Sequence, residues 1–210
     1  MKYNFIAIEG NIGAGKTSLA TKISEEYNAR LILEQFEDNA FLPKFYKEPQ
    51  KYAFPLELTF LASRYQQLKD KLSSSDLFST FTVSDYYIYK SQIFAKKTLP
   101  DDEFALYTRL FQIINSTLPK PDLLVYLYVE VPGLKKNIIK RGRVYEQDIE
   151  HEYLERIQSG YFEFIKQQQD QRILILDINN IDFVHNANDY RIISSLIMED
   201  YPIGIHRVVI

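Results

Sequence analysis

The chain has 210 residues, of which 46% are apolar and 25% charged, and this predicts one globular domain over residues 1–210 with a sizeable core. It contains no cysteine, which excludes disulfides and thiolate metal sites, and its net charge of −3 without a basic tail gives no reason to expect a nucleic-acid partner. The longest apolar run, Leu123–Val129, is too short to span a bilayer and the N-terminus has no signal-peptide pattern, so we expect a cytoplasmic protein without a membrane partner.

The first predicted strand, Phe5–Ile8, leads directly into a glycine-rich loop. Residues 9–17 read EGNIGAGKT, which contains the phosphate-binding pattern GxxxxGK[ST]. Successive backbone N–H groups of such a loop point at one anion, the lysine reaches the β- and γ-phosphates, and the threonine hydroxyl binds Mg²⁺. The pattern therefore predicts that a nucleoside triphosphate and magnesium bind here, with Thr17 as metal ligand. The expected nucleotide contacts are Gly10, Asn11, Ile12, Gly13, Ala14, Gly15, Lys16 and Thr17.

Further apolar runs alternate with segments of helical periodicity along the chain. The predicted strands are Phe5–Ile8, Leu31–Leu33, Phe81–Val83, Leu123–Val129 and Ile173–Leu176. Predicted helices follow the glycine-rich loop and cover residues 50–71, 101–118, 132–140 and 147–169. This alternation predicts an α/β fold with a parallel sheet of about five strands and helices on both faces.

Acidic residues follow three of the predicted strands. Glu34 comes after the second strand, Asp85 after the third and Asp177 after the fifth. Ligands of open α/β sheets bind at the carboxyl ends of the strands. We therefore expect Glu34 and Asp85 to converge on the loop that holds the phosphates.

The presence and absence of other motifs indicate which kind of phosphate-loop protein this chain is. A GTPase would carry the guanine-reading tetrapeptide NKxD, which is absent, and motors and ABC-type ATPases need further motifs that this chain lacks. A small-molecule kinase needs a base near the acceptor hydroxyl and cations over the transferred phosphoryl group. Glu34 is a candidate base, and Arg141-Gly142-Arg143, with Glu146 nearby, is a candidate cation cluster. The same arginines also fit a solvated turn that ends a helix.

Several segments, in order and spacing, resemble the deoxynucleoside kinase family of phosphate-loop enzymes. Besides the loop and Glu34, these segments include a Tyr46-to-Arg64 helix pattern, the acidic residue Asp85, and Arg141-Gly142-Arg143-x-x-Glu146 with the helix after it. Leu176-Asp177 is similar to the start of the loop that holds the ATP adenine. The resemblance covers nearly the whole length and implies a phosphate-loop NTPase fold with a lid segment.

The resemblance also implies roles for individual residues. The enzyme would use ATP and Mg²⁺ to phosphorylate the 5′-hydroxyl of a deoxyribonucleoside, with Glu34 taking the hydroxyl proton. Tyr46 and Glu146 would bind the sugar 3′-hydroxyl, and Glu57 and Arg64 would read the base. The implied catalytic residues are Glu34, Lys16, Arg141, Arg143 and Asp85. Arg141 and Asp177 join the loop in binding ATP, and the implied substrate contacts are Glu34, Tyr46, Glu57, Arg64, Asp85 and Glu146. Members are typically homodimers, so a homodimer is expected.

The chain departs from the family pattern at four positions. Glu57 replaces the usual glutamine, Ser91 stands where an acid is common, and Tyr86 and Asn137 each replace an arginine. Ionised Glu57 only accepts hydrogen bonds, whereas its protonated form imitates glutamine. Bases with amino or imino N–H groups suit it better than thymine, and Ser91 leaves room for a purine. We therefore expect deoxyadenosine first, followed by deoxyguanosine and deoxycytidine.

Two other functions remain open from the sequence. A nucleoside monophosphate kinase of the thymidylate kinase type shares the fold but needs arginines for the acceptor phosphate, and none occurs at 33–35 or 85–87. A nucleotide-binding regulatory protein without catalysis would tolerate loss of Glu34 or of the lid arginines, which are present here.

Overall fold

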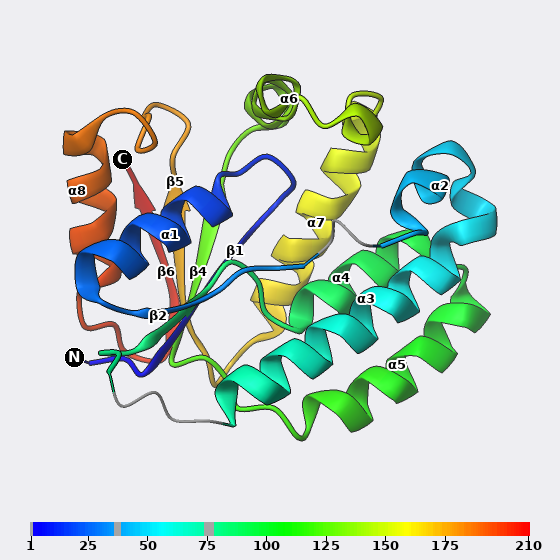
Figure 1. Ribbon diagram of the computed structural model, residues 1–210, viewed down its shortest axis with the longest axis horizontal. Helices are drawn as coiled ribbons and strands as arrows, with labels where there is room; N and C mark the ends of the chain where they lie inside the picture. The colour runs from blue at the N-terminus through cyan, green and yellow to red at the C-terminus, as the bar shows by residue number, and fades with distance from the viewer. Residues whose placement is uncertain (1, 36–38, 74–77) are drawn as a thin grey trace.

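The computed structural model describes residues 2–35, 39–73 and 78–210, and its central element is a parallel sheet (Figure 1). The six strands follow the order β2-β3-β1-β4-β5-β6, and every neighbouring pair is parallel. The strands are β1 (Phe5–Gly10), β2 (Arg30–Ile32), β3 (Thr82–Ser84), β4 (Leu123–Tyr128), β5 (Arg172–Asp177) and β6 (Gly204–Val209). The α/β fold predicted from the sequence is confirmed.

The sheet has one strand more than the sequence predicts. The five expected strands correspond to β1 through β5, and the additional strand, β6, lies beside β5 at the edge. Residues of β6 alternate between half-buried and exposed, and the polar pair His206 and Arg207 interrupts its apolar residues. An edge strand packs against a single neighbour, so no continuous apolar run marks it in the sequence.

Helices cover both faces of the sheet, as expected. One face is covered by α3, α4, α5 and α7, and the other by α1, α6 and α8 (Figure 1). The helices are α1 (Lys16–Tyr27), α2 (Leu42–Lys47), α3 (Pro49–Leu72), α4 (Tyr89–Thr98), α5 (Asp101–Asn115), α6 (Val131–Arg141), α7 (His151–Gln167) and α8 (Ala187–Ile197), with a short 3₁₀ turn, η1 (Val144–Glu146), after α6. Of the helices in the described ranges, none combines the length and apolar character needed to cross a membrane.

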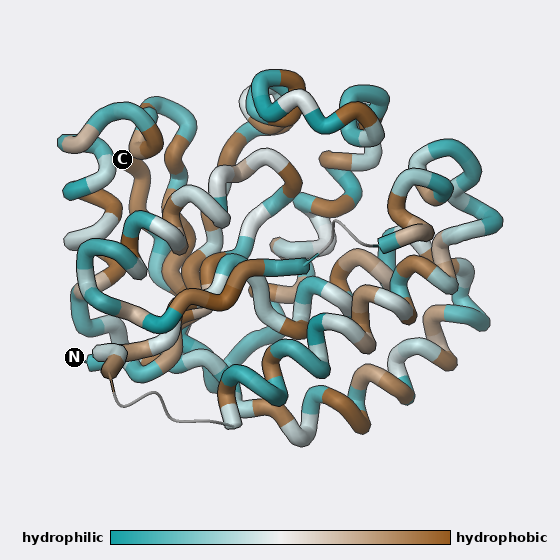
Figure 2. The backbone as a smooth tube through the Cα atoms, in the orientation of Figure 1, coloured by the Kyte–Doolittle hydropathy of each residue, from teal (hydrophilic) through white to brown (hydrophobic). Residues whose placement is uncertain are grey.

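Side-chain alternation along the strands divides the core into two layers. On β1, Phe5 and Ala7 pack with the α3–α5 and α7 side, whereas Ile6 and Ile8 pack with the α1, α6 and α8 side. Figure 2 shows apolar residues concentrated along the strands, with hydrophilic residues on the outer helix surfaces. Burial on both faces explains why the central strands read as continuous apolar runs.

We expect Ile6→Ala to destabilise the fold by about 2–5 kcal/mol, because it removes a fully buried side chain and leaves a cavity. Ile139→Ala is the matched control, since Ile139 on α6 is 55% exposed, and it should change stability by less than about 0.5 kcal/mol. Chemical denaturation of both variants is the measurement. Equal effects of the two substitutions would contradict the assignment of Ile6 to the core.

Candidate active site

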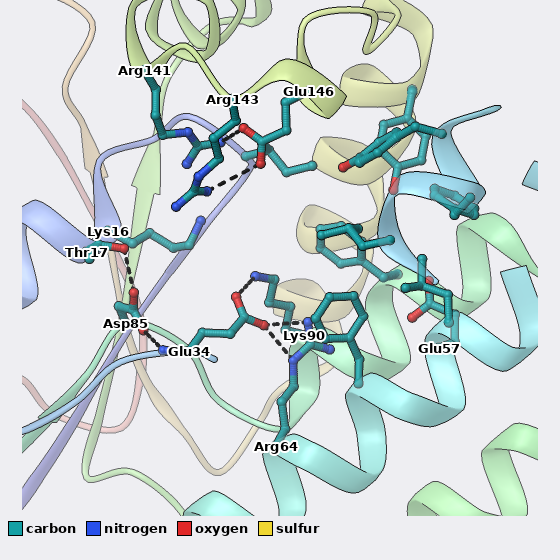
Figure 3. A pocket seen from close by; sticks show the side chains of 18 residues that line it. Lys16, Thr17, Glu34, Glu57, Arg64, Asp85, Lys90, Arg141, Arg143 and Glu146 are labelled. Atoms are coloured by element: carbon teal, nitrogen blue, oxygen red, sulfur yellow. Dashed lines mark hydrogen bonds and ion pairs between the residues drawn. The ribbon is translucent and has the colours of Figure 1, made fainter. Parts of the chain in front are cut away.

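A cavity lies at the carboxyl ends of β1, β2 and β3, where the sheet meets α3, α4 and the segment after α6 (Figure 3). Lys16 and Thr17 lie at one end of it and Glu57 at the other, with Glu34 and Lys90 between them (Figure 3). The lining residues are Ile12, Lys16, Thr17, Glu34, Leu42, Phe45, Tyr46, Leu56, Glu57, Phe60, Arg64, Asp85, Lys90, Phe94, Arg141, Arg143, Glu146 and Tyr153. Segments far apart in the sequence therefore form one site.

The glycine-rich loop joins β1 to α1 in a conformation that requires glycine. Gly13 and Gly15 have φ values of 85° and 86°, in the left-handed region. A Cβ atom at Gly13 would lie 2.7 Å from the carbonyl oxygen of Leu134, and one at Gly15 would lie 2.8 Å from the ring of Phe183. The first turn of α1 has no side-chain cap, so its backbone N–H groups and helix dipole face the loop. This geometry suits a phosphate group.

Polar contacts to two other elements, and one contact within the loop motif, stabilise the loop. The Nδ2 atom of Asn11 donates to the carbonyl of Leu154 on α7, at 2.8 Å, and Lys16 Nζ donates to the carbonyl of Asn11, also at 2.8 Å. From α6, Asn137 Nδ2 donates to the carbonyl of Gly13 at 2.9 Å. Asn137 replaces an arginine of the family pattern, and here its amide supports the loop backbone.

Asp85 connects the phosphate loop to the end of β2. Its Oδ2 atom accepts the hydroxyl of Thr17 at 2.6 Å, and its Oδ1 atom accepts the backbone N–H of Glu34 at 2.7 Å. The expected convergence of Glu34 and Asp85 on the loop is therefore present in the structure. The two bonds set the backbone of Glu34 relative to the first turn of α1.

The carboxylate of Glu34 lies between two cations. Its Oε1 atom accepts from Arg64 Nε at 2.7 Å and Nη2 at 2.6 Å, and its Oε2 atom accepts from Lys90 Nζ at 2.5 Å. Burial raises the pKa of Glu34, but Lys90 and then Arg64 outweigh it and lower the pKa to about 2. Burial, followed by repulsion from Lys90, lowers the pKa of Lys16 to about 8. Three cationic side chains and Glu34 therefore share one confined space.

Arg64 is held firmly on α3. Besides the two bonds to Glu34, its Nη1 atom donates to Ser91 Oγ at 2.7 Å, and its guanidinium lies 4.6 Å from the centre of the Phe60 ring. Ser91 is a neutral residue at a position that is often acidic in the family, so it contributes a hydrogen bond without a charge. The carboxylate of Glu34 neutralises the positive charge of Arg64.

Glu57 is buried at the far end of the cavity, with 2% of its surface exposed. Burial raises its pKa to about 7. The hydroxyl of Thr98 lies 3.0 Å both from Glu57 Oε1 and from the carbonyl oxygen of Phe94. A hydroxyl has one hydrogen, so Thr98 either donates to an ionised Glu57 or accepts from a protonated one while donating to Phe94. The site accommodates both forms of Glu57.

The segment after α6 closes the cavity from above in Figure 3. Arg141 forms an ion pair with Glu146, and Arg143 Nη1 lies 3.4 Å from Glu146 Oε1. Glu146 is buried, with 5% of its surface exposed. The ring of Tyr46 stacks on that of Tyr145. Burial raises the pKa of the Tyr46 hydroxyl, and the negative charge of Glu146 raises it further. Tyr46 and Glu146, the two residues expected to bind the sugar 3′-hydroxyl, therefore lie in the same part of the cavity.

Asp177 and Tyr86, which were both singled out in the sequence, do not line the cavity. Asp177 ends β5, where it accepts from Asn179 at 2.6 Å and from Arg207 on β6 at 3.2 Å. Tyr86, which replaces a family arginine, is fully buried and donates its hydroxyl to Gln67 on α3. Tyr86 therefore gives the cavity no cation.

Lys90 is the charged lining residue that the sequence analysis missed. A weak signal was present, because Lys90 directly follows the apolar stretch 86–89, and lysine is an unusual residue in the first turn of a buried helix.

The oxygen atoms of Thr17 and Asp85 suit a magnesium ion. They lie 2.6 Å apart beside the phosphate loop and are hard ligands of the kind that Mg²⁺ prefers. No group of three or more His, Cys, Asp or Glu residues that could hold a metal is found in the part of the chain that the structure describes. Magnesium in phosphoryl-transfer sites is bound by one or two carboxylates together with substrate phosphates.

Comparison with known proteins gives matches over most of the chain. The family model "Deoxynucleoside kinase" matches residues 6–200. A deoxyguanosine kinase of Bacillus subtilis (strain 168) is 41% identical over 202 residues, which are 93% of this chain and 96% of the relative. A deoxyadenosine kinase of Dictyostelium discoideum is 35% identical over 184 residues, or 85% of this chain and 73% of the relative.

A solved structure shows the same fold. Deoxyadenosine kinase from M. mycoides with bound dATP superposes with a TM-score of 0.80 at 25% identity, over 93% of this chain and 99% of the other. The same kinase with the products dCMP and dCDP bound also gives a TM-score of 0.80, at 27% identity over 92% and 98% of the two chains. These matches do not favour a thymidylate kinase type of enzyme. The chain belongs to the deoxynucleoside kinase family.

Proposed function

We propose that this kinase transfers the γ-phosphoryl group of ATP to the 5′-hydroxyl of a purine 2′-deoxynucleoside, in the cytoplasm, as a salvage reaction. The observation that carries the proposal is the position of Glu34, which lies in one cavity between the phosphate loop and the buried carboxyl group of Glu57. A nucleoside with its base at Glu57 would direct its 5′-hydroxyl toward Glu34 and the loop. Turnover of ATP with nucleosides, compared with nucleoside monophosphates, tests this proposal.

Different residues of the cavity have different roles in the proposed reaction. The backbone of the loop and Lys16 would hold the ATP phosphates, and Glu34 would accept the proton of the 5′-hydroxyl. Arg141 and Arg143 would turn from Glu146 to the phosphates, which frees Glu146 and Tyr46 for the 3′-hydroxyl. Phosphoryl transfer needs alignment and charge neutralisation, and these groups supply both.

Magnesium is the cofactor that we propose beside ATP. Thr17 Oγ1 would hold it, with Asp85 adjacent to the same position. When bound, the ion would neutralise charge on the phosphates during transfer. We also propose that Asp177 lies near the ATP adenine, because it ends β5 and directly precedes the loop that follows this strand.

The chemistry of Glu57 supports a purine acceptor. An ionised carboxylate accepts two hydrogen bonds, which fits the N1–H and N2–H groups of guanine. A protonated carboxyl group donates one bond and accepts another, which fits N1 and the N6 amino group of adenine. Opposite an ionised Glu57, thymine offers one N–H group between two carbonyl oxygens, so one carboxylate oxygen would face a carbonyl oxygen without a hydrogen bond. Buried unpaired polar groups discriminate strongly between substrates.

Deoxyadenosine and deoxyguanosine are both proposed as acceptors. The sequence favours deoxyadenosine, and the Dictyostelium relative is a deoxyadenosine kinase. The Bacillus relative is a deoxyguanosine kinase. The pKa of Glu57, about 7, means that both protonation forms are populated at neutral pH, so one site serves both bases.

We also propose a homodimer. Helix α5 exposes the large apolar residues Leu106, Leu110 and Ile113, which are spaced at i, i+4 and i+7 and so lie on one face. An exposed apolar stripe of this kind suits packing against another helix.

We expect Glu34→Gln to lower kcat by about 10²–10⁴-fold, because the amide cannot accept the hydroxyl proton. Lys16→Ala should also abolish turnover, with weaker ATP binding in addition. Glu163→Gln is the control, because Glu163 likewise pairs with two cations, Lys96 and Lys97, but on the surface. Steady-state kinetics and ATP titrations are the measurements. Wild-type turnover in Glu34→Gln would rule out Glu34 as the base.

We expect Arg141→Ala to lower kcat by at least about tenfold while changing nucleoside affinity much less, because its charge is needed in the transition state. Hydrogen exchange should show stronger protection of residues 141–146 when a bisubstrate analogue is bound. Lys140→Ala, one position earlier on the exposed end of α6, is the control. Unchanged protection would indicate a static surface turn.

We expect the ratio of kcat/KM for deoxyguanosine to that for deoxyadenosine to rise as pH increases from about 6 to about 8. The reason is that Glu57 is protonated below its pKa of about 7 and ionised above it. Glu57→Gln should abolish this pH dependence and favour deoxyadenosine, with little change in the KM for ATP. A flat ratio in the wild type, or a preference for thymidine, would contradict the role of Glu57.

A further inference from the structure

Lys90 is a buried cation in the cavity to which the family resemblance assigns no role. It lies in the first turn of α4, has 7% of its surface exposed, and points to Glu34 (Figure 3). Its Nζ atom lies 2.5 Å from Glu34 Oε2 and 5.5 Å from the centre of the Phe94 ring. A buried lysine is costly unless it is paired, so its place in the cavity requires a reason.

The cavity lacks a cation at the position where the family pattern has an arginine. Tyr86 occupies that position, and its hydroxyl donates to Gln67 on α3. Lys90 comes four residues later and does line the cavity. Lys16 of the phosphate loop lines the same cavity. Two lysines from different elements therefore face the space beside the loop.

The contacts of Glu34 show which of its two cations is able to move. Arg64 binds Glu34 Oε1 with two nitrogens, donates a third bond to Ser91 and stacks on Phe60. Lys90 makes one bond to Oε2 through a flexible four-carbon stem. A hydroxyl that gives its proton to Glu34 needs one carboxylate oxygen, and Oε2 is the one held by a single bond.

We propose that Lys90 is the mobile cation of this active site: it pairs with Glu34 in the structure described here and passes to the transferred phosphoryl group as the nucleoside 5′-hydroxyl takes its place on Oε2. Lys90 thereby supplies the charge that an arginine at position 86 would supply. The inference deepens the proposed kinase reaction and rests on it.

The proposed transfer exchanges one phosphorus–oxygen bond for another. The bond between the 5′-oxygen and the γ-phosphorus forms, the bond between that phosphorus and the β–γ bridging oxygen breaks, and the hydroxyl proton goes to Glu34. Lys90 keeps its protons and donates a hydrogen bond to a γ-phosphoryl oxygen. Its departure also removes the largest influence that lowers the pKa of Glu34, so the carboxylate becomes a stronger base when the hydroxyl arrives.

The test compares Lys90→Met, Lys90→Arg and the control Lys96→Met. Lys96 lies on the same helix and pairs with Glu163 on the surface. Wild-type turnover of ATP with purine deoxynucleosides is measured first, and its absence would count against the proposed reaction itself. We expect Lys90→Met to lower kcat by about 10²-fold, with the KM values for nucleoside and ATP changed less than about threefold. Lys90→Arg should recover most of kcat, and Lys96→Met should match the wild type.

A pH profile separates this role from a purely local effect on Glu34. The other charged or titratable groups that interact with Glu34 are Arg64 and Glu57 on α3, Lys16 on α1, and Asp85 and Tyr86 after β3. Loss of Lys90 should move the acid limb of kcat/KM to higher pH, while kcat on the plateau stays about 10²-fold low. Recovery of kcat on the plateau to within about threefold of the wild type would overturn the proposal. If Lys90→Met fails to fold, as judged by circular dichroism, Lys90→Gln is measured by the same criteria.

Discussion

The carboxylate of Asp85 fixes the geometry on which the active site depends. It accepts one hydrogen bond from Thr17 in the first turn of α1 and another from the backbone of Glu34 after β2. These two segments are not neighbours in the sheet, because β3 lies between β2 and β1. Asp85 follows β3, so it is the residue placed to join them. The distance between the phosphate loop and Glu34 is therefore set by one side chain whose two oxygens both accept hydrogen bonds.

Around this anchor, the cavity brings opposite charges together away from water. Lys16, Arg64 and Lys90 face Glu34, and Glu57 lies beyond them. Isolated buried charges are strongly destabilising, whereas paired and hydrogen-bonded ones are tolerated. The surplus of cations over ionised acids suits an anionic ligand, because added phosphate charge completes the pairing.

The sequence predicted those parts of the site that follow local rules. The phosphate loop is a contiguous motif, and Glu34 and Asp85 follow from the rule that parallel strands end at one edge. The pairing of Lys90 with Glu34 joins residues 56 positions apart, and no periodicity encodes it. Asp177 ends a strand as predicted, but Arg207 of the unrecognised edge strand β6 takes its carboxylate. The missed features thus depend on side-chain partners from distant elements, which a pattern along the chain does not specify.

Both carboxylates that the proposed reaction offers to the nucleoside hydroxyls are already in ion pairs. Glu34 pairs with Lys90, and Glu146 pairs with Arg141. In that reaction, a nucleoside would exchange two ion pairs for two hydroxyl contacts, and the cations released would be those that pair with the phosphates. Binding of acceptor and donor would then be coupled, since each substrate would stabilise the groups that the other displaces. A water molecule near the γ-phosphate could make only one of these exchanges. In the proposed reaction, this difference would favour transfer to a nucleoside over hydrolysis of ATP.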